Sequence, residues 1–184
     1  QNLPETTLLC LDEAYIDFVD DNFVPKISLD IKNVIRMRTF SKAYGMAGLR
    51  VGYAIGEKDL ILNFEKIRNH FGMSKISQVG VLAALEDHKF ISDVVNKVKL
   101  SKNRIADIVN NNNCKFIPSF TNFVAIDCLK DSKFAKNVLE NLINNGVFVR
   151  MPYSYPQNRC IRVTVGLDKD IDLFEKYFPI ALKE

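Results

Sequence analysis

The chain has 184 residues, 47% of them hydrophobic, and its 25 basic and 22 acidic residues leave a net charge of +3. This apolar content is enough to bury a core, so the composition excludes a disordered chain and indicates a globular protein. A nearly balanced charge gives no broad basic surface for nucleic acid, and no apolar run approaches the roughly 20 residues of a membrane helix. We therefore expect a cytoplasmic protein without nucleic-acid or membrane partners.

The cysteines and histidines predict neither disulfides nor a metal site. Four cysteines lie far apart and without C-x-x-C spacing: Cys10, Cys114, Cys128 and Cys160. Three of them stand in apolar, strand-like runs, so we expect buried free thiols. His70 and His88 have no acidic or cysteine neighbours at ligand spacing, and we expect no metal.

Three strands are predicted in the first part of the chain. Residues 6–11 (TTLLCL) are apolar and β-prone and end at Asp12 and Glu13, as a buried parallel strand does at its carboxyl end. Residues 33–40 and 49–55 alternate apolar with basic or small side chains and bracket the loop TFSKAYGMAGLR. Binding groups of α/β proteins gather at the carboxyl ends of strands, so these acids and this loop are the first candidates for a site.

Helical periodicity begins after Gly56. Residues 58–71 place apolar side chains at helical spacing, and Gly72 stands where such a helix would end. Ser74 is a plausible N-cap of a second helix. A third, amphipathic helix over about residues 89–110 is long enough to bridge two domains.

A smaller α+β unit is predicted after Cys114. Its expected elements, in order, are a strand Phe123–Cys128, a helix Ser132–Asn144, strands Val147–Arg150 and Cys160–Val165, and a helix Asp168–Leu182. Gly146 is expected to stop the first of these helices and Asp168 to cap the second. The chain is therefore predicted to hold the end of an α/β domain, a helical connector and a compact C-terminal domain.

The loop after the second strand has the composition of a phosphate site beside a reactive amine. A lysine becomes nucleophilic when desolvation or neighbouring positive charge favours its neutral form, and Arg50 follows Lys42 in this loop. The hydroxyls of Thr39 and Ser41, the forked guanidinium and the amides of a glycine-containing loop can cradle a phosphate. An amine beside a phosphate suggests pyridoxal 5'-phosphate, whose aldehyde forms a Schiff base with lysine. The alternative is a solvated hairpin turn.

An acid at the end of the first strand strengthens the cofactor hypothesis. A pyridoxal enzyme needs a carboxylate against the ring nitrogen, since only the protonated ring is a strong electron sink. Asp12 supplies that carboxylate, and Tyr15, three residues on, can hydrogen-bond the phenolic oxygen of the cofactor. Taken alone, Asp12 and Glu13 are more commonly explained as a helix N-cap and a first-turn acid.

The order and spacing of these sequence segments together resemble those of a known family. The segments LDEAYIDF (11–18) and RTFSKAYGMAGLRVGYAIG (38–56), with Lys42 thirty residues after Asp12, closely resemble the histidinol-phosphate aminotransferases of the aspartate-aminotransferase-like pyridoxal-phosphate superfamily. The resemblance implies that Lys42 carries the Schiff base and shuttles a proton. It also implies the other cofactor contacts: Asp12 to the ring nitrogen, Tyr15 to O3′, and Thr39, Ser41 and Arg50 to the phosphate.

The C-terminal segment GVFVRMPYSYPQNRCIRVTVG (146–166) is similar to the substrate-binding stretch of the same family. The resemblance implies that Arg162 clamps the carboxylate of glutamate and that Arg150 and Arg162 hold the phosphate of the imidazole substrate. A structural role stays open for both, and for Arg159. The implied domains are residues 1–73, the C-terminal part of the large cofactor-binding domain with its mixed, mostly parallel sheet, residues 74–112, connecting helices, and residues 113–184, the small C-terminal domain.

The resemblance covers only the C-terminal half of that family. The chain begins Gln1-Asn2-Leu3-Pro4 without an initiator methionine, so we expect a piece of a longer protein that is inactive alone. Members of the family are homodimers that exchange an amino group between L-histidinol phosphate and 2-oxoglutarate in histidine biosynthesis. Aromatic-amino-acid aminotransferases and threonine-phosphate decarboxylases share the lysine loop and remain alternatives, as does a non-catalytic fragment that keeps the loop by descent.

Overall fold

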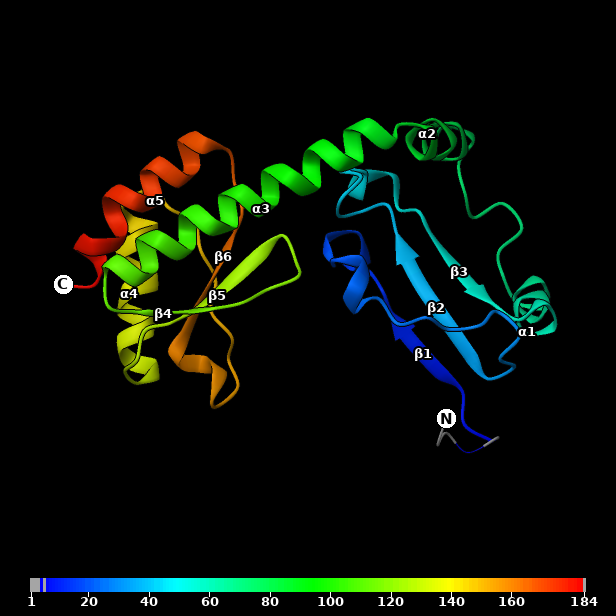
Figure 1. Ribbon diagram of the computed structural model, residues 1–184, viewed down its shortest axis with the longest axis horizontal. Helices are drawn as coiled ribbons and strands as arrows, with labels where there is room; N and C mark the ends of the chain where they lie inside the picture. The colour runs from blue at the N-terminus through cyan, green and yellow to red at the C-terminus, as the bar shows by residue number, and fades with distance from the viewer. Residues whose placement is uncertain (1–3, 5, 184) are drawn as a thin grey trace. The chain divides into compact units, whose positions relative to one another are not determined.

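The computed structural model describes Pro4 and residues 6–183. Residues 1–3, on which the expectation of a longer protein rests in part, lie outside the described residues, as do Glu5 and Glu184. The chain forms two compact units, Gln1–Val95 and Asn96–Glu184 (Figure 1). The division between them falls inside the long helix α3 (His88–Asn111).

The first unit is built on a three-stranded mixed sheet in the order β1-β2-β3. Strand β1 (Leu9–Asp12) pairs in parallel with β2 (Val34–Thr39), and β2 pairs antiparallel with β3 (Gly52–Gly56). The central strand buries Val34 and Ile35, while β1 is an edge strand of the described sheet. The predicted α/β class and all three strands are confirmed.

The parallel pairing brings two chain segments to the same edge of this sheet. Strand β1 ends at Asp12, which lies opposite Met37, and β2 ends two residues later at Thr39. The 3-10 helix η1 (Ile16–Phe18) follows β1, and a loop containing η3 (Ala47–Leu49) joins β2 to β3. Carboxyl ends of parallel neighbours meet at one edge, so the acidic segment and the lysine loop are brought together.

Two expectations for the first unit are wrong. The predicted helix over 58–71 is only the short α1 (Lys58–Leu62) followed by the 3-10 turn η4 (Asn63–Lys66), so Gly72 does not end a helix. Its apolar stripe has no partner among the described residues, as Ile67 and Phe71 are 83% and 95% exposed, and helices of this length depend on packing for stability. Cys10 is exposed rather than buried because β1 is an edge strand.

Helix α2 (Lys75–Glu86) begins as predicted. The hydroxyl of Ser74 accepts a hydrogen bond from Ser77 N at 3.0 Å, which satisfies one of the free amides of the first turn. The hydroxyl of Ser77 donates to the carbonyl of Leu49 at 3.0 Å. This bond fastens α2 to the end of the lysine loop.

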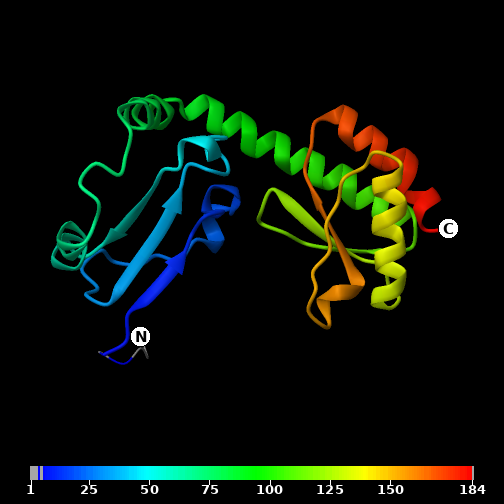
Figure 2. The same ribbon diagram turned by 180° about the vertical axis from the view of Figure 1, so that it is seen from behind.

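The second unit packs helices on one face of an antiparallel sheet, as Figures 1 and 2 show. The sheet order is β4 (Lys115–Ile117), β5 (Phe123–Asp127), β6 (Cys160–Thr164), and the helices are the C-terminal part of α3, α4 (Ser132–Asn144) and α5 (Asp168–Ala181). Val124 and Ile126 are fully buried beneath the helices. Burial of each such side chain contributes about 1.5–3 kcal/mol.

Details of the second unit depart from expectation. Residues 147–150 form no strand; only Arg150 reaches the sheet, through a single bridge to Arg162. The N-cap of α5 is Leu167, whose amide donates to the carboxylate of Asp170 at 2.9 Å, because Asp168 already lies inside the helix. Strand β4 was not predicted, since three residues are too few to show alternation. Helix α4 is confirmed, and Gly146 ends it with φ of 80°.

Within the described residues, no helix combines the length and the apolar character that crossing a bilayer requires.

The four thiols should differ sharply in reactivity. Burial raises the pKa of the Cys128 thiol to about 12, whereas Cys10 is exposed. Because the thiolate is the nucleophile, iodoacetamide at mildly alkaline pH should modify Cys10 first and spare Cys128 until the chain unfolds. Mass spectrometry of a labelling time course checks this, and Cys10→Ser should remove the fast phase. Equal labelling of the two thiols would contradict the fold described.

Candidate active site

Lys42 lies in a short, well-bonded loop that leaves β2. Phe40, which is 2% exposed, anchors the loop: its amide donates to Val51 O at 3.2 Å and its carbonyl accepts from Met46 N at 2.9 Å. The turn after Lys42 is closed by a bond from Gly45 N to Lys42 O at 3.0 Å, with Gly45 at φ of 68°, where glycine is favoured. The loop is therefore a fixed platform and not a loose hairpin.

Tyr15 contacts this loop from the segment after β1, and Asp12 is the last residue of that strand. The Asp12 side chain is exposed, and its Oδ1 accepts from Ala14 N at 3.0 Å, which orients the carboxylate. The Nζ of Lys42 lies 5.1 Å from the centroid of the Tyr15 ring, within cation–π range. Residues 27 positions apart in the chain thus meet at the sheet edge, and Asp12 is not a helix N-cap, since η1 has Tyr15 at that position.

Thr39 and Ser41 present paired hydroxyls beside Lys42. Their oxygens lie 2.9 Å apart, and Ser41 N donates to Thr39 Oγ1 at 3.1 Å. The carbonyl of Val51 lies 3.3 Å from Thr39 Oγ1, so this hydroxyl has a choice of acceptors. Two adjacent hydroxyls on a fixed turn can reorient toward an incoming anion.

Arg50 adopts a backbone conformation that is unfavourable for its residue type. Its φ of 54° and ψ of 48° are left-handed, which costs a non-glycine residue about 1–3 kcal/mol. The guanidinium is exposed and donates to Ala47 O at 2.9 Å within its own turn. Such strain persists where the surrounding structure imposes it, and it is common at ligand-binding sites.

An ion triad around the buried Glu13, with partly buried Arg36 and Arg38, was missed by the sequence interpretation. Glu13 is 7% exposed, and its two oxygens accept from Arg36 Nε at 2.7 Å and Arg38 Nε at 2.8 Å. The signal was present in the sequence: arginines at alternate positions of a predicted strand share one face and need a buried acid when that face is covered. The pairing partner could not be identified without the parallel register of β1 and β2.

Arg150 and Arg162 lie together in the second unit. Their backbones exchange two hydrogen bonds, of 3.0 Å and 2.6 Å, and both side chains line a groove of about 930 Å³ with Tyr153, Asn158 and Lys136. Arg162 is on the sheet face opposite the helices, with its guanidinium carbon 5.0 Å from the Phe123 ring centroid. Its Nε is buried and lacks a hydrogen-bond partner in the described part of the chain. This groove therefore offers an anion an unused donor.

Arg159 has a structural partner instead. It donates to Asp127 Oδ2 at 2.5 Å, and that carboxylate, 4% exposed, also accepts from Leu129 N at 2.9 Å. The pair ties the segment before β6 to the end of β5. The question left open for Arg159 is answered in favour of a structural contact.

Removing Arg159 should destabilise the protein. Arg159→Met leaves the buried Asp127 without its charged partner, so we expect the free energy of unfolding to fall by about 1–3 kcal/mol. Urea denaturation measures this. Arg104→Met is the matched control, because Arg104 pairs with the exposed Asp172 and Glu175, and its loss should leave stability almost unchanged. Equal losses of unfolding free energy in the two variants would contradict the structural role of Arg159.

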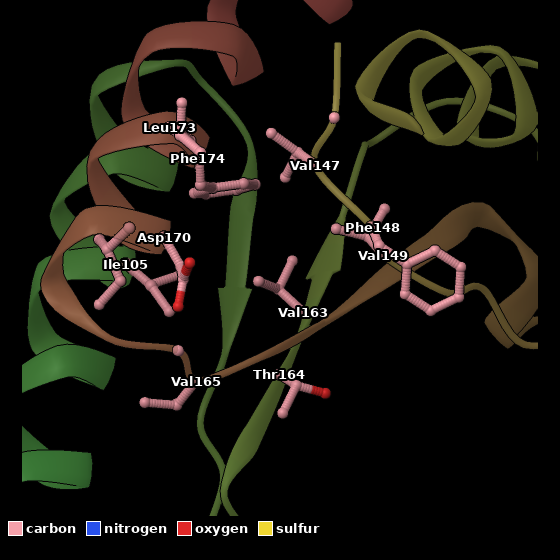
Figure 3. A pocket seen from close by; sticks show the side chains of 13 residues that line it. Ile105, Val147, Phe148, Val149, Val163, Thr164, Val165, Asp170, Leu173 and Phe174 are labelled. Carbon is pink, nitrogen blue, oxygen red and sulfur yellow. The ribbon is translucent and has the colours of Figure 1, made fainter. Parts of the chain in front are cut away.

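A second pocket of the second unit is a packing feature. Figure 3 shows Ile105, Val163 and Phe174 around it, and its volume is about 320 Å³. The carboxylate of Asp170 points into this region but already accepts the hydrogen bond that caps α5. We assign no chemistry to it.

Comparison with known proteins agrees with this arrangement. The family model "Aminotransferase class I and II" matches residues 3–173. The chain is 36% identical to histidinol-phosphate aminotransferase 2 of Legionella pneumophila (strain Lens) over 90% of its own length and 45% of that protein's, and 38% identical to the Bacillus velezensis histidinol-phosphate aminotransferase over 89% and 46%. It thus spans about half the length of these curated relatives.

The fold agrees as well. The crystal structure of histidinol-phosphate aminotransferase from Sinorhizobium meliloti in complex with pyridoxal-5'-phosphate superposes with a TM-score of 0.94 at 44% identity, over 98% of this chain and 50% of that one. Thermotoga maritima aspartate aminotransferase, at 21% identity and a TM-score of 0.82, shares the fold. Since the family model covers most of its residues, the chain belongs to the class I and II aminotransferases.

Proposed function

We propose that the chain is the lysine-bearing part of a pyridoxal-5'-phosphate-dependent aminotransferase that moves the amino group between L-histidinol phosphate and 2-oxoglutarate in histidine biosynthesis. The observation that carries the proposal is the meeting of Lys42 with the β1 end, 5.1 Å from the Tyr15 ring, in a chain of this family. The names of relatives at 36–44% identity support the substrates, and the cofactor of the Sinorhizobium protein supports the cofactor.

The residues present fit this cofactor. A Cβ placed on Gly45 or Gly48 would meet no atom within 4 Å, so the loop leaves space for an approaching phosphate. The Thr39 and Ser41 hydroxyls border that loop, and the exposed Asp12 carboxylate stands at the same sheet edge. A phosphate, a pyridine nitrogen and an aldehyde would each find a partner of suitable chemistry.

Each residue would have a separate task. The bound cofactor supplies an aldehyde for the amino group and a ring that accepts electrons. Lys42 Nζ would hold the cofactor through its aldehyde carbon, and this amine would serve as the general base that moves a proton. Asp12 would accept a hydrogen bond from the ring N–H, and the Tyr15 hydroxyl would donate to O3′. Thr39, Ser41 and Arg50 would bind the phosphate.

Arg162 and Arg150 would bind the substrates. The planar guanidinium of Arg162 can bind a carboxylate through two parallel hydrogen bonds. The N–H of its buried Nε has no hydrogen-bond partner among the described residues. Arg150, its neighbour across the bridge, would add positive charge for the phosphate of histidinol phosphate. Because the chain spans about half the length of its relatives, we propose this activity, and the homodimer, for the whole protein.

Cofactor capture and one half-reaction test the proposal. In the whole protein, titration with pyridoxal 5'-phosphate should give the visible absorbance band of a protein-bound Schiff base, and histidinol phosphate should then discharge that band. Phenylalanine is the competing donor, since related aromatic aminotransferases share the loop. A band that never forms would overturn the cofactor assignment, and faster discharge by phenylalanine would overturn the substrate.

A further inference from the structure

Glu13 fastens the end of β1 to β2 through three contacts. Its carboxylate bridges Arg36 and Arg38, at 2.7 Å and 2.8 Å, and its amide donates to Met37 O at 2.8 Å. The contacts therefore reach three successive residues of the neighbouring strand. One acid fixes both the separation and the register of the two strand ends.

The charge of Glu13 is secured by its partners. Burial raises the pKa of Glu13 and is the largest single effect, but hydrogen bonds and charges from Arg36 and Arg38 together outweigh it and lower the pKa. Arg38 also hydrogen-bonds Tyr53, and burial raises the pKa of nearby Asp17 although Arg38 opposes that rise. At neutral pH the triad thus holds a carboxylate anion between two cations.

Stability alone is a weak reason for such a triad. Buried ion pairs are commonly no more stabilising than apolar side chains of similar size, because desolvation offsets their attraction. What a triad does provide is a fixed geometry. That geometry matters most for β1, which has four residues and pairs only with β2 in the described sheet, whereas β2 is also held by β3 through the Thr39–Gly52 pair.

Asp12 is the residue whose position would depend on the triad. Successive side chains of a strand point to opposite faces, so a buried Glu13 leaves the preceding Asp12 on the exposed face, as observed. We infer that Glu13 is a positioning residue, which through Arg36 and Arg38 holds the Asp12 carboxylate at a fixed place relative to Lys42. The inference rests on the proposed function, in which Asp12 meets the ring nitrogen. A displacement of about 1 Å in such a site can cost about a hundredfold.

A double-variant comparison tests this role. Glu13→Gln should weaken the binding of pyridoxal 5'-phosphate about tenfold in an absorbance titration, the size expected for coupled neighbours in one network. In an Asp12→Asn background the same change should have little further effect, because the carboxylate that it positions is gone. The pH dependence of the absorbance band should shift in the same direction in Glu13→Gln as in Asp12→Asn, a change that a purely structural role would not produce.

Controls keep the outcomes distinct. Glu65→Gln, which breaks an exposed pair with Arg68 in the same unit, should leave binding unchanged. Circular dichroism verifies folding, and if Glu13→Gln does not fold, Arg38→Lys replaces it, because it keeps the charge but loses the 2.8 Å bond.

The two proposals fail in different ways. If the whole wild-type protein takes up no cofactor, the proposed function fails and the inference falls with it. If the wild type binds but Glu13→Gln weakens binding equally with and without the Asp12 carboxylate, only the inference is overturned.

Discussion

Lys42→Ala should abolish the Schiff-base absorbance band completely while leaving the fold intact. Lys42 is half-buried, and its described contact is the Tyr15 ring at 5.1 Å, so its loss should change the free energy of unfolding by no more than about 0.5–1 kcal/mol. The chemical loss should be total because Lys42 is the lysine that lies beside the Tyr15 ring. Absorbance after addition of pyridoxal 5'-phosphate and thermal unfolding of the apoprotein measure the two effects.

Two further variants separate the ability of Lys42 to form a Schiff base from the effect of its positive charge. Lys42→Arg keeps a cation beside Tyr15 but cannot form a Schiff base, so it should behave like Lys42→Ala. Lys26→Ala removes an exposed lysine of the same unit and should retain the full band. A band that persists in Lys42→Ala, or disappears in Lys26→Ala, would refute the assignment of the amine.

Arg162→Met should raise stability and lower anion affinity at the same time. The buried, unpartnered Nε carries a desolvation cost of about 1–3 kcal/mol, whereas its stacking on Phe123 returns only about 0.5–1 kcal/mol. Replacing it with an apolar side chain of similar length should therefore stabilise the apoprotein by about 1 kcal/mol. Loss of the charged donors should weaken 2-oxoglutarate binding at least about tenfold.

The matched control for this experiment is Arg159→Met. Arg159 lies in the same chain segment, just before Arg162, but it already pairs with Asp127. Its removal should therefore lower the melting temperature and leave 2-oxoglutarate binding unchanged. Arg162→Lys should keep part of the charge attraction without the two-bond fork. Calorimetric titration and thermal unfolding give both quantities. If Arg162→Met is destabilised as much as Arg159→Met, the assignment of Arg162 as an anion-binding residue with an unpaired Nε is wrong.

Local signals predicted the elements whose ends are set by neighbouring residues. Helix α4 begins after Asp131, whose carboxylate accepts from Phe134 N at 2.9 Å, and ends at Asn144, two residues before Gly146, and both signals are visible in the sequence. The helix over 58–71 had the right periodicity but no partner for its apolar stripe among the described residues. Periodicity indicates which face needs burial, while packing decides whether the helix forms.

The candidate site likewise contains residues that the sequence predicts and residues that only the fold brings together. Lys42, Thr39 and Ser41 could be predicted because they lie in one short segment whose composition indicates an anion site. The triad could not, because Glu13 and its arginines are 23 and 25 positions apart and meet only through the register of β1 and β2. The Nε of Arg162 is buried without a partner among the described residues, and no local pattern encodes that burial.

The central claim is that Lys42 is the residue that forms the Schiff base. Borohydride reduction after incubation with pyridoxal 5'-phosphate fixes such a bond as a stable secondary amine, and peptide mass spectrometry then locates it. We predict a single pyridoxyl group on the peptide that contains Lys42. A pyridoxyl group on another lysine with Lys42 unmodified, or no modification of the folded whole protein, would contradict this assignment.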